Sequence, residues 1–179
     1  MNKIQRASYL LHLLFKILYW ATPLATVYLI VFNIEGMMNW GAWSSIISAN
    51  KIQSYNYSPV HRLVILAIQA IPLSITVLIF RNLSKLFGLY AQGKLFEQEN
   101  IKLIKGISIY MIVGELVQLM YQPLITAALS FANPAGQRFA SITLGTTNAT
   151  TLMTSVIILV ASWIIKEANQ LKSDSQLTI

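Results

Sequence analysis

Four long apolar segments constrain this chain of 179 residues more than any other feature. The segments are residues 7–32, 63–80, 107–129 and 144–165. Each is close to or above the ~20 residues with which a helix crosses a bilayer core, and each is too long for a typical strand. Because lipid offers no hydrogen-bond partners, backbone groups in segments of this length must pair within a helix. The sequence therefore predicts an all-α membrane protein with one domain of four transmembrane helices.

The scarcity of charge supports the same class. Charged residues make up 11% of the chain and hydrophobic residues 55%, whereas a soluble domain carries about 25% charged residues. The chain has no cysteine, which removes thiolate metal sites. His12 and His61 are predicted to lie near opposite faces of the membrane, so we expect no metal site and no cofactor. The basic surplus contains no dense run or stripe, so nucleic-acid binding is not expected.

The placement of Lys and Arg predicts the orientation, because loops on the cytoplasmic side carry the excess. Four spans put both termini on one side. That side has ten basic residues, namely Lys3, Arg6, Lys16, Arg81, Lys85, Lys94, Lys102, Lys105, Lys166 and Lys172. The other side has three, Lys51, Arg62 and Arg138. We therefore expect a multi-pass protein of the inner (cytoplasmic) membrane with both termini in the cytoplasm.

The loops divide into one patterned inner segment and two outer segments. The inner arm, 82–106, starts with an amphipathic pattern that predicts a helix lying at the cytoplasmic interface. Gly93 is expected to end that helix, and a second helix is expected to run on into the third span. The outer loops are 33–61 and 130–143. Trp40, Trp43, Tyr55 and Tyr57 in the first of them are expected to face the lipid headgroups.

Two short motifs carry a family resemblance. The run from Gly93 to Asn100, GKLFEQEN, contains a Gly followed by an apolar-Phe pair and an Asn. The tail contains Glu167 and Leu171 and ends Leu177-Thr178-Ile179. With four spans in this order, the chain resembles the bacterial domain-of-unknown-function family twenty-nine seventy-five. The resemblance implies a small inner-membrane protein without established enzymatic activity, often encoded beside a Cro/C1-type helix-turn-helix regulator. It supplies no catalytic residues.

One polar stripe stands out inside the spans. Glu115, Gln118 and Gln122 lie at i, i+3 and i+7 of the third span, so they are expected to share the face toward the bundle interior. Lys16 is ten residues from Arg6, as Glu115 is from Lys105, and the two could lie at similar depth and pair. Gln69, near Pro72 in the second span, is a further candidate, with helix packing as its alternative role.

The stripe leaves two interpretations open. Glu115 is either a carboxyl that senses a proton or ligand in a polar cavity, or an interhelical tether. Lys16 either pairs with it or extends to the headgroups. No catalytic motif is present, so we expect no enzymatic activity.

The sequence favours a membrane-embedded regulatory or sensory protein. Its arm and tail would form a cytoplasmic surface for a protein partner such as a small helix-turn-helix regulator. The candidate surface consists of Lys85, Gly93, Phe96, Asn100, Glu167, Leu171 and Leu177. The alternative is a small transporter, channel or immunity-type protein that uses the stripe around Glu115. A homo-oligomer is compatible with either.

Overall fold

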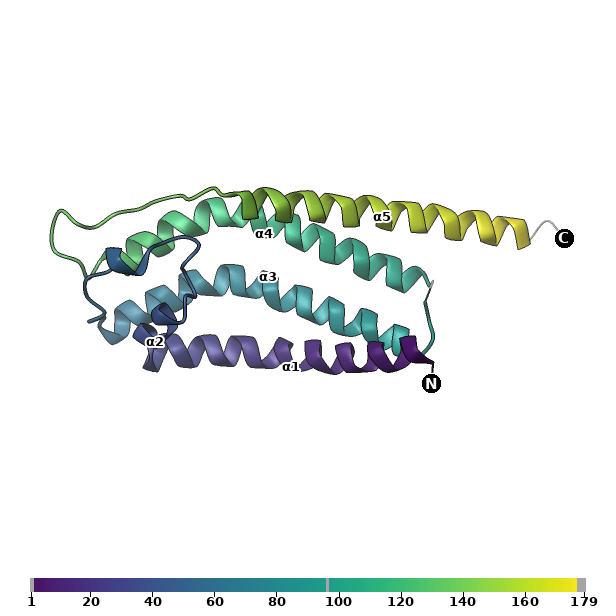
Figure 1. Cartoon of the computed structure of the whole chain (residues 1–179), viewed down its shortest axis with the longest axis horizontal. Helices are drawn as coiled ribbons and strands as arrows, with labels where there is room; N and C mark the ends of the chain where they lie inside the picture. The colour runs from purple at the N-terminus through teal and green to yellow at the C-terminus, as the bar shows by residue number, and fades with distance from the viewer. Residues whose placement is uncertain (1, 96, 177–179) are drawn as a thin grey trace.

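The computed structural model describes residues 2–95 and 97–176 of the chain, and all regular structure in this part is helical (Figure 1). The elements in chain order are α1 (Lys3–Phe32), α2 (Ile34–Asn39), the 3-10 helix η1 (Ala49–Lys51), α3 (Pro59–Ala91), α4 (Gln98–Ser130) and α5 (Thr146–Gln176).

Four of these helices are long and apolar enough to cross a membrane: α1, α3, α4, and residues Asn148–Leu171 of α5. A helix of 30 or 33 residues, the lengths of α1 and of α3 and α4, is about 45–50 Å long at 1.5 Å per residue. That length exceeds a hydrocarbon core of about 30 Å. The four predicted long helices are confirmed as candidate spans. α1, α3 and α4 include their predicted segments and extend beyond them, whereas α5 begins at Thr146, inside its segment, and continues past the end of it.

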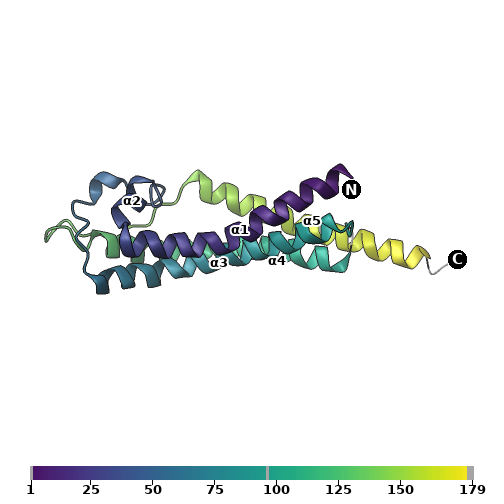
Figure 2. The same cartoon turned by 90° about the horizontal axis from the view of Figure 1, so that it is seen from below.

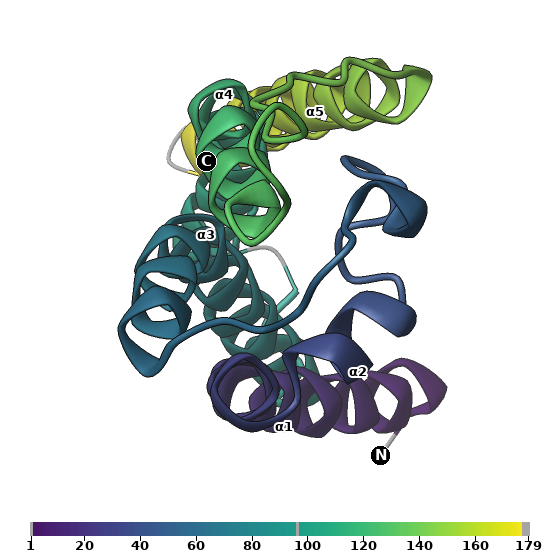
Figure 3. The same cartoon turned by 90° about the vertical axis from the view of Figure 1, so that its left-hand side faces the viewer.

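The four long helices pack in chain order and form an open arc. α1 packs against α3, α3 against α4, and α4 against α5. Seen end-on, α1 and α5 lie at the two ends of the arc, with α2 and the loop after it on the inner side (Figure 3). Because α1 and α5 have no extensive contact with each other, the inner side of the arc is not closed off along its length.

The helices define two ends of the molecule. Both termini and the connection between α3 and α4 lie at one end, here called the terminal end (Figures 1 and 2). Residues 33–58 and 131–145 lie at the other end, here called the loop end. An even number of long helices places the two termini together, as predicted.

The inner arm differs from the prediction. Residues 82–91 continue α3 without a break and do not form a separate helix at the membrane interface. Their apolar face packs against α1, where the ring of Phe87 stacks on that of Phe15 with centroids 5.7 Å apart. His12 Nδ1 donates to the Ser84 carbonyl at 2.7 Å. An amphipathic pattern can be satisfied by a neighbouring helix as well as by headgroups, which is why the sequence pattern misled.

The end of the arm agrees with the prediction. α3 ends at Ala91, and Gly93 takes a φ of +83°, the left-handed conformation that glycine adopts at little cost. α4 then starts at Gln98 and continues to Ser130 as one helix. The second predicted helix of the arm and the third span are thus a single element.

The first outer loop is also different from the prediction, because much of it is buried. Trp43 is 1% exposed and Tyr57 5% exposed, and they join a hydrophobic core whose other members are listed here: Ile30, Ile34, Met37, Met38, Ile47, Ile52, Ile65, Tyr121, Ile125, Ala128 and Leu129. Trp40, in contrast, is 84% exposed. The loop is therefore a folded cap on the loop end of the arc, and its aromatic residues do not all face the headgroups.

Hydrogen bonds hold this cap to the spans. The Tyr57 hydroxyl donates to the Leu129 carbonyl at 2.7 Å. Burial raises the pKa of Tyr57 to about 12, with a smaller contribution from Tyr55, so the hydroxyl stays protonated and able to donate at neutral pH.

The buried Asn133 joins the two outer loops, since its Nδ2 donates to the Lys51 carbonyl and its Oδ1 accepts from the Gln53 N–H. Neighbouring His61 Nε2 donates to the Ala128 carbonyl at 2.7 Å.

Candidate functional site

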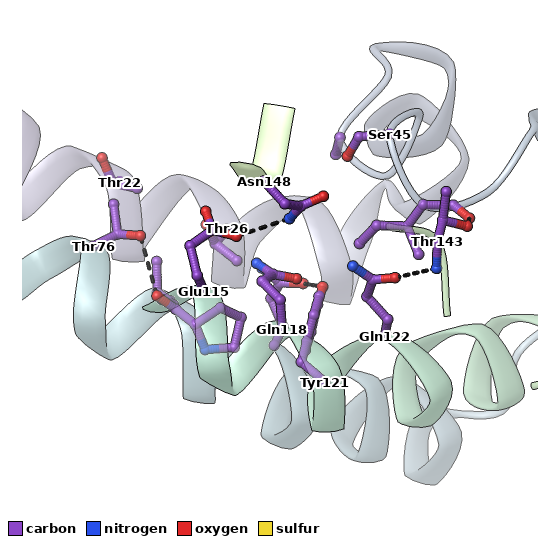
Figure 4. Close-up of a pocket in the computed structure, with 15 residues that line it drawn as sticks. Thr22, Thr26, Ser45, Thr76, Glu115, Gln118, Tyr121, Gln122, Thr143 and Asn148 are labelled. Atoms are coloured by element: carbon purple, nitrogen blue, oxygen red, sulfur yellow. Dashed lines mark hydrogen bonds between the residues drawn. The ribbon is translucent and has the colours of Figure 1, made fainter. Parts of the chain in front are cut away.

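A polar pocket of about 410 Å³ lies on the inner side of the arc, adjacent to the loop-end cap (Figure 4). All four long helices and both outer loops contribute to its wall. The lining residues are Thr22, Thr26, Ala42, Ser45, Ile46, Gln69, Pro72, Leu73, Thr76, Glu115, Gln118, Tyr121, Gln122, Thr143 and Asn148. Eleven of these fifteen carry a hydroxyl, amide or carboxyl group, which is unusual for a cavity between apolar helices, where polar side chains are expensive.

The predicted polar stripe of α4 lies in this pocket. Glu115, Gln118 and Gln122 all line it, as their spacing indicated. The Gln122 side chain is buried, and its Oε1 accepts from the backbone N–H of Thr143 at 2.6 Å. Gln122 therefore connects α4 to the second outer loop and has a structural role in the wall of the pocket.

Glu115 connects α4 to α5. Its Oε2 accepts a hydrogen bond from Asn148 Nδ2 at 2.8 Å, and Asn148 lies in the first turn of α5. One turn along α4, Gln118 has a buried Oε1 that finds no hydrogen-bond partner within the described part of the chain. Buried acceptors without a partner are uncommon in proteins, so an acceptor beside a carboxyl in a cavity indicates a place where a donor can bind.

Gln69 belongs to a second polar group at the wall of the pocket. Trp43 Nε1 donates to Gln69 Oε1 at 3.1 Å and to the Tyr121 hydroxyl at 2.9 Å. The Tyr121 hydroxyl in turn donates to Gln69 Oε1. This group joins α3, α4 and the cap. Gln69 thus has the packing role that was its alternative, and it also lines the pocket.

Several lining residues were missed at the level of sequence, although part of the signal was there. Tyr121 is three residues after Gln118 and so shares the face of the stripe. Thr22 and Thr26 are four residues apart in α1, a spacing that puts both hydroxyls on one face. Asn148 could not have been found in this way, because only the packing of α5 brings it to the pocket. The same holds for Trp43, which does not line the pocket but donates to the lining residues Gln69 and Tyr121.

Lys16 lies apart from the pocket. Its side chain is exposed on α1, and it does not line the cavity. In the part of the chain that the structure describes, the one ion pair joins Lys94 to Glu97, at 4.0 Å. Of the two interpretations of Lys16, the pairing with Glu115 is absent, and Glu115 faces the pocket without a basic partner among the described residues. Its hydrogen-bond partner is the neutral amide of Asn148.

The candidate partner surface is only partly accessible. Lys85, Gly93, Glu167 and Leu171 are exposed. Asn100 is 1% exposed, and its Nδ2 donates to the Lys94 carbonyl at 2.6 Å. This residue holds the connection between α3 and α4 in shape and does not belong to a surface. Phe96 and Leu177 lie outside the described residues.

Comparison with known proteins agrees with the motifs seen in the sequence. A family model described as Protein of unknown function (DUF2975) matches residues 43–179. The chain belongs to this family. The match begins at Trp43, inside the cap, and includes α3, α4 and α5, so the DUF2975 region supplies most of the pocket. No curated protein and no solved structure matches the chain.

The Glu115–Asn148 contact can be tested with a double-mutant cycle. We expect Glu115→Leu and Asn148→Leu to be non-additive, with a coupling of about 0.6 kcal/mol and at most about 1.7 kcal/mol, the range for hydrogen bonds between membrane helices. The measurement is reversible unfolding of the full chain in micelles. Glu115→Gln should keep only part of the coupling, because its Oε1 can still accept from Asn148 but the charge is lost. Strict additivity of the two Leu variants would show that the side chains do not interact.

Proposed function

We propose that this chain is a membrane-embedded sensory or regulatory protein. Its pocket would bind a proton or a small ligand at Glu115, and α5 would carry the response to the terminal end. The observation that supports this best is the Asn148–Glu115 hydrogen bond, because it links the occupancy of the pocket to the position of one helix. The proposal assigns no enzymatic reaction to the site.

The packing of α5 makes it a suitable output element. α5 packs extensively against α4 but not against α1 or α3, so few contacts resist its movement. It runs as one helix from Thr146 to Gln176, and a change of its position at Asn148 would therefore also displace Glu167 and Leu171. A ligand can shift an equilibrium between two positions of α5 only by as much as its affinity differs between them. A proton on Glu115 removes the charge that Asn148 contacts, which supplies such a difference.

The proposed location is the inner membrane of a bacterium, with the terminal end in the cytoplasm. The support is the basic bias, ten Lys and Arg residues against three, together with the shared end of the two termini. A partner would then bind the exposed Lys85, Glu167 and Leu171 from the cytoplasm. We propose a small transcriptional regulator as the partner class, a choice that rests on the family resemblance.

A transporter or channel is the second candidate function. It is favoured by the contribution of all four long helices to the polar pocket. The space that adjoins the pocket toward the terminal end, however, is lined mainly by apolar side chains, which is unfavourable for the passage of ions. Proteoliposome flux that Glu115→Gln abolishes would support this candidate over the sensory one.

The sensory proposal predicts that the position of α5 depends on the charge of Glu115. Because the chain has no cysteine, Gln92→Cys and Ala168→Cys give two clean spin-label positions, both exposed. The distance distribution between the labels, measured in nanodiscs by double electron–electron resonance, should shift in Glu115→Gln, which removes the charge that Asn148 contacts. The exposed Glu35→Gln removes a charge in the loop-end cap and should leave the distribution unchanged. An unshifted distribution in Glu115→Gln would contradict the proposal.

The orientation can be tested with a matched pair of cysteine variants. Gln92 and Gln137 are both exposed, at the terminal end and the loop end respectively. In intact spheroplasts a membrane-impermeant maleimide should label Gln137→Cys and leave Gln92→Cys unlabelled. Disruption of the membrane should make both reactive. The reverse pattern in intact cells would place the termini outside.

The partner surface predicts a position-specific effect of charge. Leu171 is 63% exposed, and Leu171→Glu should weaken co-purification of a helix-turn-helix regulator encoded beside the chain and co-expressed with it. Gln170→Glu, which adds the same charge at the neighbouring exposed position, should leave co-purification unchanged. Equal recovery with both variants would rule out this part of α5 as the contact.

A further inference from the structure

A second cavity, of about 350 Å³, adjoins the polar pocket. The two share four lining residues, Pro72, Thr76, Glu115 and Gln118. From these the second cavity continues between α3 and α4 toward the terminal end, since its remaining α3 residues come later in the chain than Pro72 and its remaining α4 residues come earlier than Glu115. Glu115 and Gln118 thus lie at the junction between the polar pocket and the second cavity.

The second cavity is mainly apolar. Beyond the shared residues its wall consists of Ile75, Ile79, Phe80, Tyr110, Met111, Gly114 and Thr151. Gly114 places no side chain in this space, and a Cβ there would make an ordinary contact with Ile75 Cγ2 at 3.5 Å. A ligand that occupies both spaces must therefore have a polar head and an apolar body.

The groups at the junction decide the chemistry of the head. The Glu115 carboxyl has no basic partner among the described residues, and the buried Gln118 Oε1 has no hydrogen-bond donor. Both are acceptors, so they favour a group that only donates. A primary ammonium has three donors and no acceptor, and its charge complements a carboxylate. A carboxylate or phosphate head would place acceptor against acceptor, and a bare metal ion would leave the apolar cavity without an occupant.

We infer that the site binds an amphiphile with a primary ammonium head and an apolar chain. The ammonium would bind at Glu115 and Gln118, and the chain would lie between α3 and α4 against Ile79 and Phe80. Such a molecule can enter from the membrane, because α1 and α5 do not close the inner side of the arc. The inference rests on the proposed function, in which Glu115 is the responding group. Its two sources, a free long-chain amine and an aminophospholipid, share this chemistry.

Photolabelling tests the inference on the full chain in phosphatidylcholine nanodiscs, whose lipid carries no primary amine. The probe is dodecylamine with a diazirine in its chain, and mass spectrometry locates the labelled residues. We expect label on the cavity wall, mainly Ile79, Phe80 and Met111. Unlabelled dodecylammonium should compete, whereas dodecanol, which has the same chain without the charge, should not. Label spread equally over the lipid-facing Leu116 and Met120 would overturn the inference.

Two variants separate the head from the chain. Glu115→Gln should reduce cavity labelling by about tenfold or more, the effect of losing a charged hydrogen bond. Gly114→Leu should also reduce it, by filling the apolar space, and Val113→Leu, on the exposed neighbouring face, should not. If Gly114→Leu fails to fold, Gly114→Ala, whose methyl group makes only ordinary contact with Ile75, should still give a partial reduction. Undiminished labelling in Glu115→Gln would overturn the ammonium assignment.

Failure of this inference differs from failure of the proposed function. If Glu115→Gln shifts the position of α5 in phosphatidylcholine nanodiscs but no specific photolabelling occurs, the amphiphile is wrong and the sensory proposal stands. If photolabelling is specific and the shift is absent, the binding site stands and the output through α5 is wrong. Phosphatidylethanolamine added to the nanodiscs separates the sources: suppression of labelling identifies the lipid, and unchanged labelling identifies a free amine.

Discussion

The polar side chains of α4 cannot face lipid at acceptable cost, and the arrangement of the other helices follows from this constraint. Glu115, Gln118 and Gln122 lie on one face, so α4 turns that face toward the inner side of the arc. The neighbouring elements supply matching groups, an amide from α5 and a backbone N–H from the second outer loop. Because a single buried stripe needs partners from both sides, the helices leave a polar pocket in place of a dense apolar centre.

The loop-end cap supplies a further donor to the polar groups of the spans. The Trp43 indole N–H donates to both Gln69 Oε1 and the Tyr121 hydroxyl, and so finds partners of its own in an apolar environment. An aromatic side chain suits this position, since its body adds to the hydrophobic core while its edge donates. The cap is thus as much a part of the pocket as the spans are.

The sequence carries the information for the spans and for the stripe more clearly than for the cap. The length of each apolar span depends only on residues within one helix. The same is true of the face shared by Glu115, Gln118 and Gln122, so both can be predicted from the sequence pattern. The burial of Trp43 depends on contact with Tyr121, which is 78 positions away. The burial of Asn100 depends on the turn before α4, where its Nδ2 donates to the Lys94 carbonyl. Residues 82–91 show a third limit, because the same amphipathic pattern fits a headgroup layer and the surface of α1 equally well.

The chain-order packing of the long helices has a consequence for how the protein assembles. α3 can pack on α1, and α5 on α4, as each leaves the insertion machinery, since every helix finds its neighbour already in the membrane. The cap cannot form so early. Its core needs Tyr121, Ile125 and Leu129 from the far half of α4, so residues 33–58 must wait for most of the chain. Closure of the pocket is therefore a late event in biogenesis, and a chain that stalls before α4 would expose Trp43 and its apolar neighbours.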